Sequence, residues 1–161
     1  IVRQLHPNTK IVGVFVNHSK KEVEEIARSV PLDTLQFHGD ESPEFCKSFL
    51  DEWTVIKAIR IANEKGLAQL EIYQDSCDHF LLDAFDPKLY GGSGKQIEEG
   101  LVSKDIVENT FLSGGLTPEN IASKVAEYQP YGVDVASGIE SSPGIKDLEK
   151  MKKFMASLPK S

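Results

Sequence analysis

The chain has 161 residues, of which 40% are hydrophobic and 27% charged, a composition typical of one folded domain rather than a disordered chain. Its net charge of −7, without a basic run, argues against nucleic acid or an anionic membrane as partner, because both require clustered Lys and Arg. The sequence also lacks a run of about 18 apolar residues, so we expect no membrane span. A small anionic substrate is compatible with this charge, since backbone amides can hold a phosphate in an acidic protein.

Cysteine and histidine spacing predicts neither disulfides nor a metal site. Cys46 and Cys77 show no CxxC pattern, which makes a reducing cytoplasm the expected compartment. The four histidines are scattered, without a His-x-x-x-His pair, so we expect no metal and no metal cofactor. The chain begins at Ile1 instead of a methionine, from which we expect that an upstream segment is absent.

Short apolar strands alternate with helical patterns six times along the chain. The first strand, residues 11–16, is followed by Ser19 and Glu22 at capping-box spacing and then by an apolar stripe of helical period. The predicted strands are residues 11–16, 34–38, 55–59, 79–83, 110–113 and 132–137, and the predicted helices begin near residues 19, 42, 64, 96, 117 and 146. The last helix is expected to bury a stripe formed by Leu148, Met151, Met155 and Leu158.

Six strand–helix units in succession require a parallel sheet with helical crossovers. Two α/β architectures fit: a complete, open doubly wound sheet, or a (β/α)8 TIM barrel without its first two strands. Polar residues within apolar strands, namely Gln36, His38, Lys57, Asp83 and Asp134, favour the barrel, whose mouth lets such groups reach solvent or ligand. For any one of them alone, a structural polar group paired with a neighbour is the better explanation.

The catalytic and ligand-binding residues of parallel α/β proteins lie at the carboxyl ends of the strands, on the loops that lead into helices. Asp83 ends the fourth strand, and partial desolvation there favours its protonated form and suits it to donate a proton. An Asp that only caps the next loop fits the position equally well. The loop that follows, Tyr90–Gly94, is either a flap over a ligand or a plain flexible turn.

The last two strands are both followed by turns of small residues. Gly114 and Gly115 allow the backbone to approach an anion, and Ser137 with Gly138 adds a hydroxyl donor after the next strand. The loops after the seventh and eighth strands of a barrel commonly hold phosphate, so the pair predicts a phosphate site.

Seven motifs in order give the chain a close resemblance to the phosphoribosylanthranilate isomerase family, over residues 11–147. They are Val12–Asn17, Leu35–Glu41, Val55–Ala58, Leu81–Asp83, Tyr90–Gly94, Ser113–Asn120 and Val133–Glu140. The resemblance implies that residues 1–161 are a single domain of a ribulose-phosphate-binding type of barrel, with the six strands here as the third to eighth.

The resemblance also implies an activity in tryptophan biosynthesis that needs no cofactor. This is the Amadori rearrangement of N-(5'-phosphoribosyl)anthranilate to 1-(2-carboxyphenylamino)-1-deoxyribulose 5-phosphate. By this resemblance Asp83 is the acid that opens the ribose ring, and Gly114, Gly115, Ser137 and Gly138 hold the phosphate. Asp134 and His38 match positions near the substrate.

The general base of the family is a cysteine in a Lys-Ile-Cys-Gly-like segment that this sequence does not contain. Cys77 precedes Asp83 by six residues, roughly 20 Å at about 3.3 Å per residue, and Cys46 lies in an apolar helical stripe, so we expect both to be structural. We therefore expect this chain alone to be an impaired enzyme that turns over substrate far more slowly than a longer version with that segment. An alternative function is a non-catalytic phosphate-binding fragment, which would self-associate through open sheet edges. A barrel acting on indole-glycerol phosphate is a second enzymatic alternative, disfavoured by Asp83 together with the Tyr90–Gly94 loop.

Overall fold

The computed structural model describes residues 5–61, 64–84 and 109–159. The glycine-rich loop at residues 90–94 and the helix expected near residue 96 lie outside these ranges. None of the helices in the described part is both long and apolar enough to cross a membrane.

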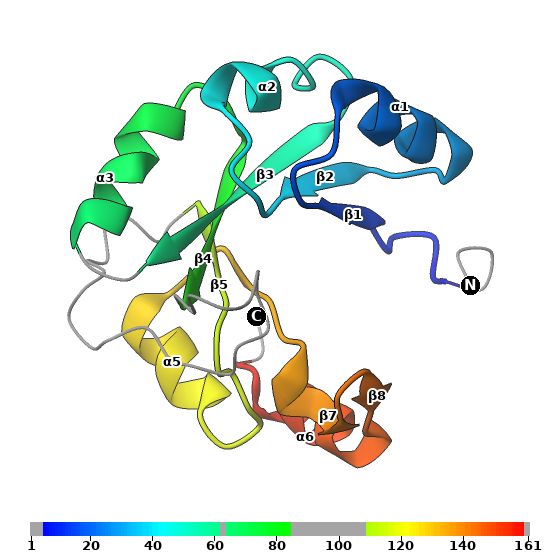
Figure 1. The fold of residues 1–161 in the computed structure, drawn as a ribbon. Coiled ribbons are helices and arrows are strands. Elements are labelled where there is room, and N and C mark those ends of the chain that lie inside the picture. The colour runs from blue at the N-terminus through cyan, green and yellow to red at the C-terminus, as the bar shows by residue number, and fades with distance from the viewer. Residues whose placement is uncertain (1–4, 62–63, 85–108, 160–161) are drawn as a thin grey trace.

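Six parallel strands form one sheet in the order of the sequence. They are β1 (Val12–Phe15), β2 (Thr34–Phe37), β3 (Thr54–Ile61), β4 (His79–Ala84), β5 (Thr110–Leu112) and β6 (Gly132–Val133). A doubly wound sheet reverses its strand order at a switch point, and this sheet does not, so that alternative is wrong. Figure 1 shows the sheet curving into a half-barrel with the helices around its outside.

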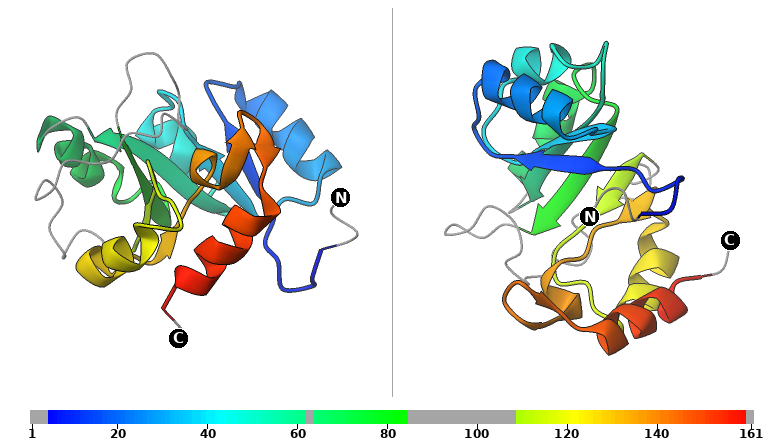
Figure 2. Two further views of the ribbon diagram at one scale, coloured as in Figure 1. Left: turned by 90° about the horizontal axis from the view of Figure 1, so that it is seen from below. Right: turned by 90° about the vertical axis from the view of Figure 1, so that its right-hand side faces the viewer.

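Two helices start where the sequence places capping residues, whereas α5 (Ile121–Tyr128), predicted to begin near residue 117, begins at Ile121 without a side-chain cap. Ser19 caps α1 (Lys20–Ser29): its hydroxyl accepts from the Glu22 amide, and the Glu22 carboxylate accepts from the Ser19 amide. Ser42 caps the short α2 with its hydroxyl alone, which accepts from the Phe45 amide. The helices are α1, α2 (Pro43–Lys47), α3 (Glu64–Tyr73), α5 (Ile121–Tyr128) and α6 (Leu148–Ser157), of which α5 and α6 pack side by side (Figure 2).

Alternation along the strands separates two packing faces. Leu35, Phe37 and Val55 are fully buried against Val23, Ala27, Cys46 and Phe49 of the helical layer. Ile56, Ala58 and Leu81 pack with Phe111 in a separate cluster on the inner side of the sheet. Gln36 and His38 alternate with Leu35 and Phe37, so their side chains point to the inner side.

The last predicted strand is much shorter than expected. Its partner β5 ends at Leu112, and the final ladder bond is the Asp134 amide donating to the Leu112 carbonyl at 2.8 Å. Beyond that point the chain has no strand to pair with, and it forms a 3₁₀ turn (Ser137–Ile139). An antiparallel pair that we did not predict, β7 (Glu140–Ser142) and β8 (Ile145–Lys146), follows.

The predicted buried face of the last helix is also wrong. Leu148 and Met155 are 69% and 68% exposed, and Met151 is 37% exposed, whereas Phe154 is buried. The Asp147 amide donates to the Ile139 carbonyl at 2.9 Å and fixes how α6 is rotated, so Phe154 packs with Ile121 and Ile139. Leu158 packs partly against the same cluster, as expected.

Candidate active site

The loops after β5 and β6 and the end of β2 enclose one pocket. It has about 340 Å³ of empty space, part of it open to solvent, and is lined by His38, residues 113–116 and residues 134–138. Six of the seven predicted site residues line this pocket: Gly114, Gly115, Ser137, Gly138, Asp134 and His38. The structure therefore brings these six residues together, although they come from the ends of three separate strands.

Glycine is required at three positions of the pocket. Gly114 and Gly115 have φ angles of +89° and +63°, the left-handed region that glycine adopts without strain. A Cβ on Gly138 would overlap the carbonyl oxygen of Leu116, so the two loops can touch only because this residue has no side chain. At these three positions the wall of the pocket is backbone alone, and exposed backbone amides are a kind of surface that can bind phosphate.

Side-chain hydrogen bonds fix the loop after β5. The Asn120 amide donates to the Gly115 carbonyl at 2.9 Å and its oxygen accepts from the Thr117 amide at 2.8 Å. On the other side, the Ser113 hydroxyl donates to Asp134 at 3.0 Å and connects the ends of β5 and β6. These contacts hold the loop in one conformation before any ligand arrives.

Asp83 joins the pocket through His38. Both side chains are buried, and His38 Nε2 lies 3.2 Å from Asp83 Oδ2. His38 Nδ1 lies 3.0 Å from the amide nitrogen of Gln36, which can only donate, so Nδ1 accepts and Nε2 carries the proton. His38 in this neutral form donates to the Asp83 carboxyl group.

The second oxygen of Asp83 is left available for chemistry. Oδ1 is buried and has no hydrogen-bond partner among the residues that the structure describes. A buried polar atom without a partner is rare in folded proteins, and a catalytic role is one of the explanations for it. A protonated Asp83 can accept from His38 through Oδ2 and offer a proton from Oδ1 at the same time.

The two cysteines have the properties of structural thiols. Burial raises the pKa of Cys46 and of Cys77 to about 12, far from the range of a reactive thiolate. Cys46 packs in the cluster with Phe37 and Phe49, and the Cys77 thiol lies 3.5 Å from the Tyr73 carbonyl. Neither is in the lining of the pocket.

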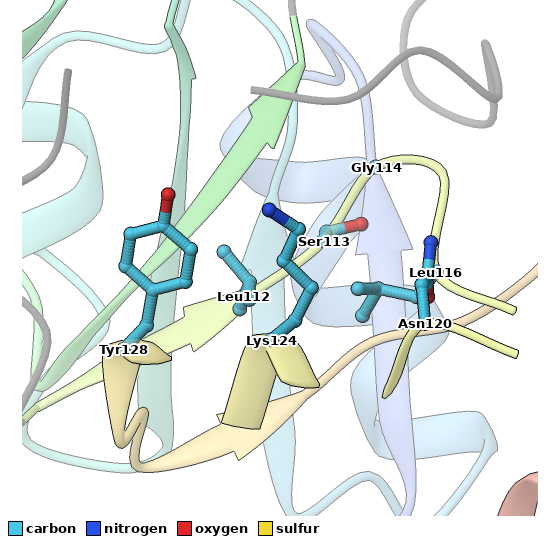
Figure 3. A pocket seen from close by; sticks show the side chains of 7 residues that line it. All are labelled: Leu112, Ser113, Gly114, Leu116, Asn120, Lys124 and Tyr128. Atoms are coloured by element: carbon cyan, nitrogen blue, oxygen red, sulfur yellow. The ribbon is translucent and has the colours of Figure 1, made fainter. Parts of the chain in front are cut away.

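A second pocket lies on the α5 side of the same loop (Figure 3). It holds about 280 Å³ of empty space and shares Ser113, Gly114 and Leu116 with the first pocket. Lys124 and Tyr128 extend from α5 in the same direction, alongside Leu112, and the Lys124 amine lies 5.4 Å from the Tyr128 ring.

One polar cluster beside the site was not foreseen. Lys57 does not reach the barrel mouth: it is 2% exposed and forms an ion pair with Glu41 at 3.0 Å. Its neighbours Val55 and Ile59 pack in the clusters on the helical side, and strand alternation from these residues would have placed Lys57 there too. Across the described ranges, no group of three His, Cys, Asp or Glu side chains is arranged to hold a metal ion.

Comparison with known proteins consistently relates this chain to one family of isomerases. Residues 1–157 match the profile of the N-(5'-phosphoribosyl)anthranilate (PRA) isomerase family. The isomerase of Nitrosococcus oceani is 43% identical over 155 residues, which are 96% of this chain and 74% of that protein. The isomerase of Rippkaea orientalis is 38% identical over an alignment of 162 positions with gaps, which covers 98% of this chain and 75% of that protein.

Solved structures that resemble this chain belong to the same family of isomerases. The phosphoribosyl anthranilate isomerase of Thermotoga maritima superimposes with a TM-score of 0.86 and 36% identity, covering 96% of this chain and 75% of that one. A phosphoribosyl anthranilate isomerase in complex with reduced 1-(o-carboxyphenylamino)-1-deoxyribulose 5-phosphate gives a TM-score of 0.79 and 33% identity, covering 96% and 74% of the two chains.

Proposed function

This chain belongs to the N-(5'-phosphoribosyl)anthranilate isomerase family, and from this membership we propose the reaction that it catalyses. The reaction is the Amadori rearrangement of N-(5'-phosphoribosyl)anthranilate to 1-(2-carboxyphenylamino)-1-deoxyribulose 5-phosphate, in tryptophan biosynthesis. The observation that carries the proposal is the His38–Asp83 pair set against a pocket lined by the glycine-containing loops after β5 and β6. A phosphorylated sugar is the substrate class that this combination fits.

We assign the proton donor for ring opening to Asp83. With the phosphate held by the loops at Gly114, Gly115, Ser137 and Gly138, the ribose extends toward His38 and Asp83. Asp83 Oδ1 gives its proton to the ring oxygen as the bond from that oxygen to C1 breaks, which leaves a protonated imine at C1 and an ionised Asp83. A base, in this family a cysteine, takes the proton from C2, so the electron pair of that bond neutralises the imine nitrogen and an enol forms. Addition of a proton at C1 and loss of the enol proton then give the ketone. Asp134, held by Ser113, orients the substrate beside the phosphate.

We further propose that β1 to β6 correspond to the third to eighth strands of a (β/α)8 barrel. The sequential parallel order and the pocket after the last two strands support this correspondence. The family's cysteine base has no counterpart motif in this sequence. This observation keeps one alternative open, a chain that binds phosphate without turnover.

Two further proposals concern the state of the chain. We propose that it self-associates, because β1 and β6 each have one neighbouring strand in the described sheet and α6 exposes apolar residues. A reducing, cytoplasmic location fits the free thiols of Cys46 and Cys77.

The test is turnover of freshly generated N-(5'-phosphoribosyl)anthranilate, with binding of the reduced product analogue measured in parallel. We expect the parent chain to turn over substrate slowly, and Asp83→Asn to lose roughly a further 10²- to 10⁴-fold in kcat while it still binds the analogue. Asp51→Asn removes an exposed carboxylate and serves as the matched control.

The possible results separate the two functions. Binding of the analogue without turnover by the parent chain would establish the non-catalytic alternative. A parent chain that neither binds the analogue nor turns over substrate would contradict both. Full activity in Asp83→Asn would remove Asp83 from its assigned role.

A further inference from the structure

The buried Lys57 ammonium group makes three hydrogen bonds, as many as it has protons. It donates to the Phe37 carbonyl at 3.3 Å, the Gly39 carbonyl at 2.6 Å and the Glu41 carboxylate at 3.0 Å. The two carbonyl groups belong to the residues immediately before and after His38. Lys57 therefore holds the backbone on both sides of the histidine that contacts Asp83.

Glu41 completes this arrangement around the same histidine. Its carboxylate accepts from the Gly39 amide at 2.9 Å and from the Asn17 amide at 2.8 Å, and its carbonyl accepts from the Tyr73 hydroxyl at 2.8 Å. The His38 amide itself donates to the Phe15 carbonyl at 2.9 Å. The loop after β2 is thus fixed to the end of β1 through the buried Glu41 carboxylate and to α3 through the Glu41 backbone carbonyl.

The position of the cluster separates it from the reaction itself. Lys57 lies on the helical side of the sheet, with its ammonium 5.6 Å from the Tyr73 ring, whereas His38 and Asp83 lie on the inner side. Lys57 and Glu41 are not in the lining of the pocket. Any effect that they have on catalysis must be transmitted through the backbone of residues 37–41.

We propose that Lys57 and Glu41 are positioning residues that set the orientation and the protonated nitrogen of the His38 ring against Asp83. This inference rests on the proposed function for its catalytic consequence. A buried ion pair is by itself weak support for fold stability, because desolvation offsets most of the attraction between the charges. Its hydrogen bonds here all converge on one short loop, and the rigidity of that loop determines where His38 points.

The first test observes His38 directly, without substrate. The variant Lys57→Met/Glu41→Gln removes both charges together, so no buried charge remains unpaired. In the ¹⁵N-labelled parent chain we expect ring signals of a single tautomer with the proton on Nε2 of His38. In the variant we expect these signals to shift toward a mixture of tautomers, while His6, His18 and His79 keep theirs.

A matched control removes an ion pair of the same length elsewhere. Arg28 and Glu52 are 3.0 Å apart on the surface, and Arg28→Met/Glu52→Gln makes an equivalent change in charge. This control should leave the His38 signals unchanged. If Lys57→Met/Glu41→Gln does not fold, Glu41→Gln alone keeps the side-chain volume and should still shift the His38 signals.

The second test separates positioning from stability by a double-mutant cycle with His38→Asn. In the parent background we expect Lys57→Met/Glu41→Gln to lower kcat by roughly 10- to 100-fold with little change in KM. In the His38→Asn background it should lower kcat no further, since its effect passes through His38. Its effect on the unfolding midpoint should be the same in both backgrounds.

Either test can overturn the proposal. Unchanged His38 signals in a folded variant would show that the pair is only structural, and kcat losses that multiply in the cycle would show that its effect does not pass through His38. A parent chain without turnover would contradict the proposed function but leave the NMR test valid. The two failures are therefore distinguishable.

Discussion

Gly138 is the position at which the two loops of the proposed phosphate site meet. The carbonyl oxygen of Leu116 occupies the space of a Cβ at this position, and it belongs to the backbone of the other loop and cannot rotate away. Any side chain there must push the loops apart. The residue type is therefore fixed by contact between loops, although Gly138 itself does not have a positive φ angle.

We predict that Gly138→Ala loses affinity for the product analogue by about ten-fold or more, the equivalent of one lost hydrogen bond to a charged group. Isothermal titration of the analogue measures this loss. Gly144→Ala is the control: Gly144 has open space around it but a φ of +81°, so alanine there should cost about 1 kcal/mol of stability and no affinity. Equal affinity in Gly138→Ala and the parent chain would contradict the proposed phosphate site.

The buried thiols give a prediction with a defined pH window. Burial raises the pKa of Cys46 and of Cys77 from 9.0 to about 12, so the folded state holds its thiol protons more tightly than the unfolded state. Their contribution to stability is complete below pH 9 and is lost as the pH rises toward 12.

We therefore expect both thiols of the folded chain to react with iodoacetamide far more slowly than a free cysteine at pH 8, and to react normally in denaturant. The Cys46→Ala/Cys77→Ala variant should keep the kcat of the parent chain, with less of the decline in stability between pH 9 and 12. Fast modification of the native chain, or loss of kcat in the variant, would show that a cysteine has a role in the reaction.

At the scale of single elements, the capping signals at Ser19 and Ser42 predicted helix starts correctly because they depend on residues three positions apart, whereas the Thr117-Pro118 signal did not, since α5 begins at Ile121. The Ser19–Glu22 capping box formed as predicted, and so did the Ser42 cap with Pro43. Predictions that depended on a distant neighbour were less accurate. The strand predicted over residues 132–137 ended at Val133, because β5 offered no further partner beyond Leu112.

We predict that Ser19→Ala lowers the free energy of unfolding by about 1 kcal/mol, because it removes the hydroxyl that accepts from the Glu22 amide. Urea denaturation at pH 7 measures the change. Ser123→Ala is the control, since the Ser123 hydroxyl lies within α5 and donates to a helical carbonyl, where alanine is well tolerated. An equal loss in both variants would mean that the capping box contributes nothing specific.

At the scale of the whole molecule, the strand order explains why the site could be predicted. In a sheet whose strands follow the sequence, carboxyl ends of neighbouring strands lie together, so Asp83, Gly114 and Ser137 had to lie along the same edge. The pairing of Lys57 with Glu41 could not be predicted in the same way. It requires knowing both which face Lys57 occupies and how the loop at residues 38–41 folds back over it.

The exposed face of α6 could not be predicted either, because it depends on how the helix is rotated against the sheet. Leu148 and Met155 lie on its outer side, and on β1 Val12 and Val14 are 44% and 58% exposed. Apolar side chains on a strand with one neighbour favour pairing with another chain. The half-barrel thus exposes apolar side chains on both its first strand and its last helix, and these are the surfaces through which we propose that it self-associates.

We predict that the sedimentation coefficient of the parent chain rises with concentration, and that Leu148→Glu/Met155→Lys reduces this rise without changing the circular dichroism spectrum. The new charges suit the helix dipole, with the acid near the start of α6 and the base near its end.

Val14→Lys should reduce association further if the β1 edge takes part, because a lysine on an edge strand opposes pairing. The control is Glu149→Lys/Lys152→Glu, which reverses an exposed ion pair on the same helix and should leave the association unchanged. A parent chain that sediments as a monomer at every concentration would show that these apolar surfaces are tolerated in water, and would remove the proposal of self-association.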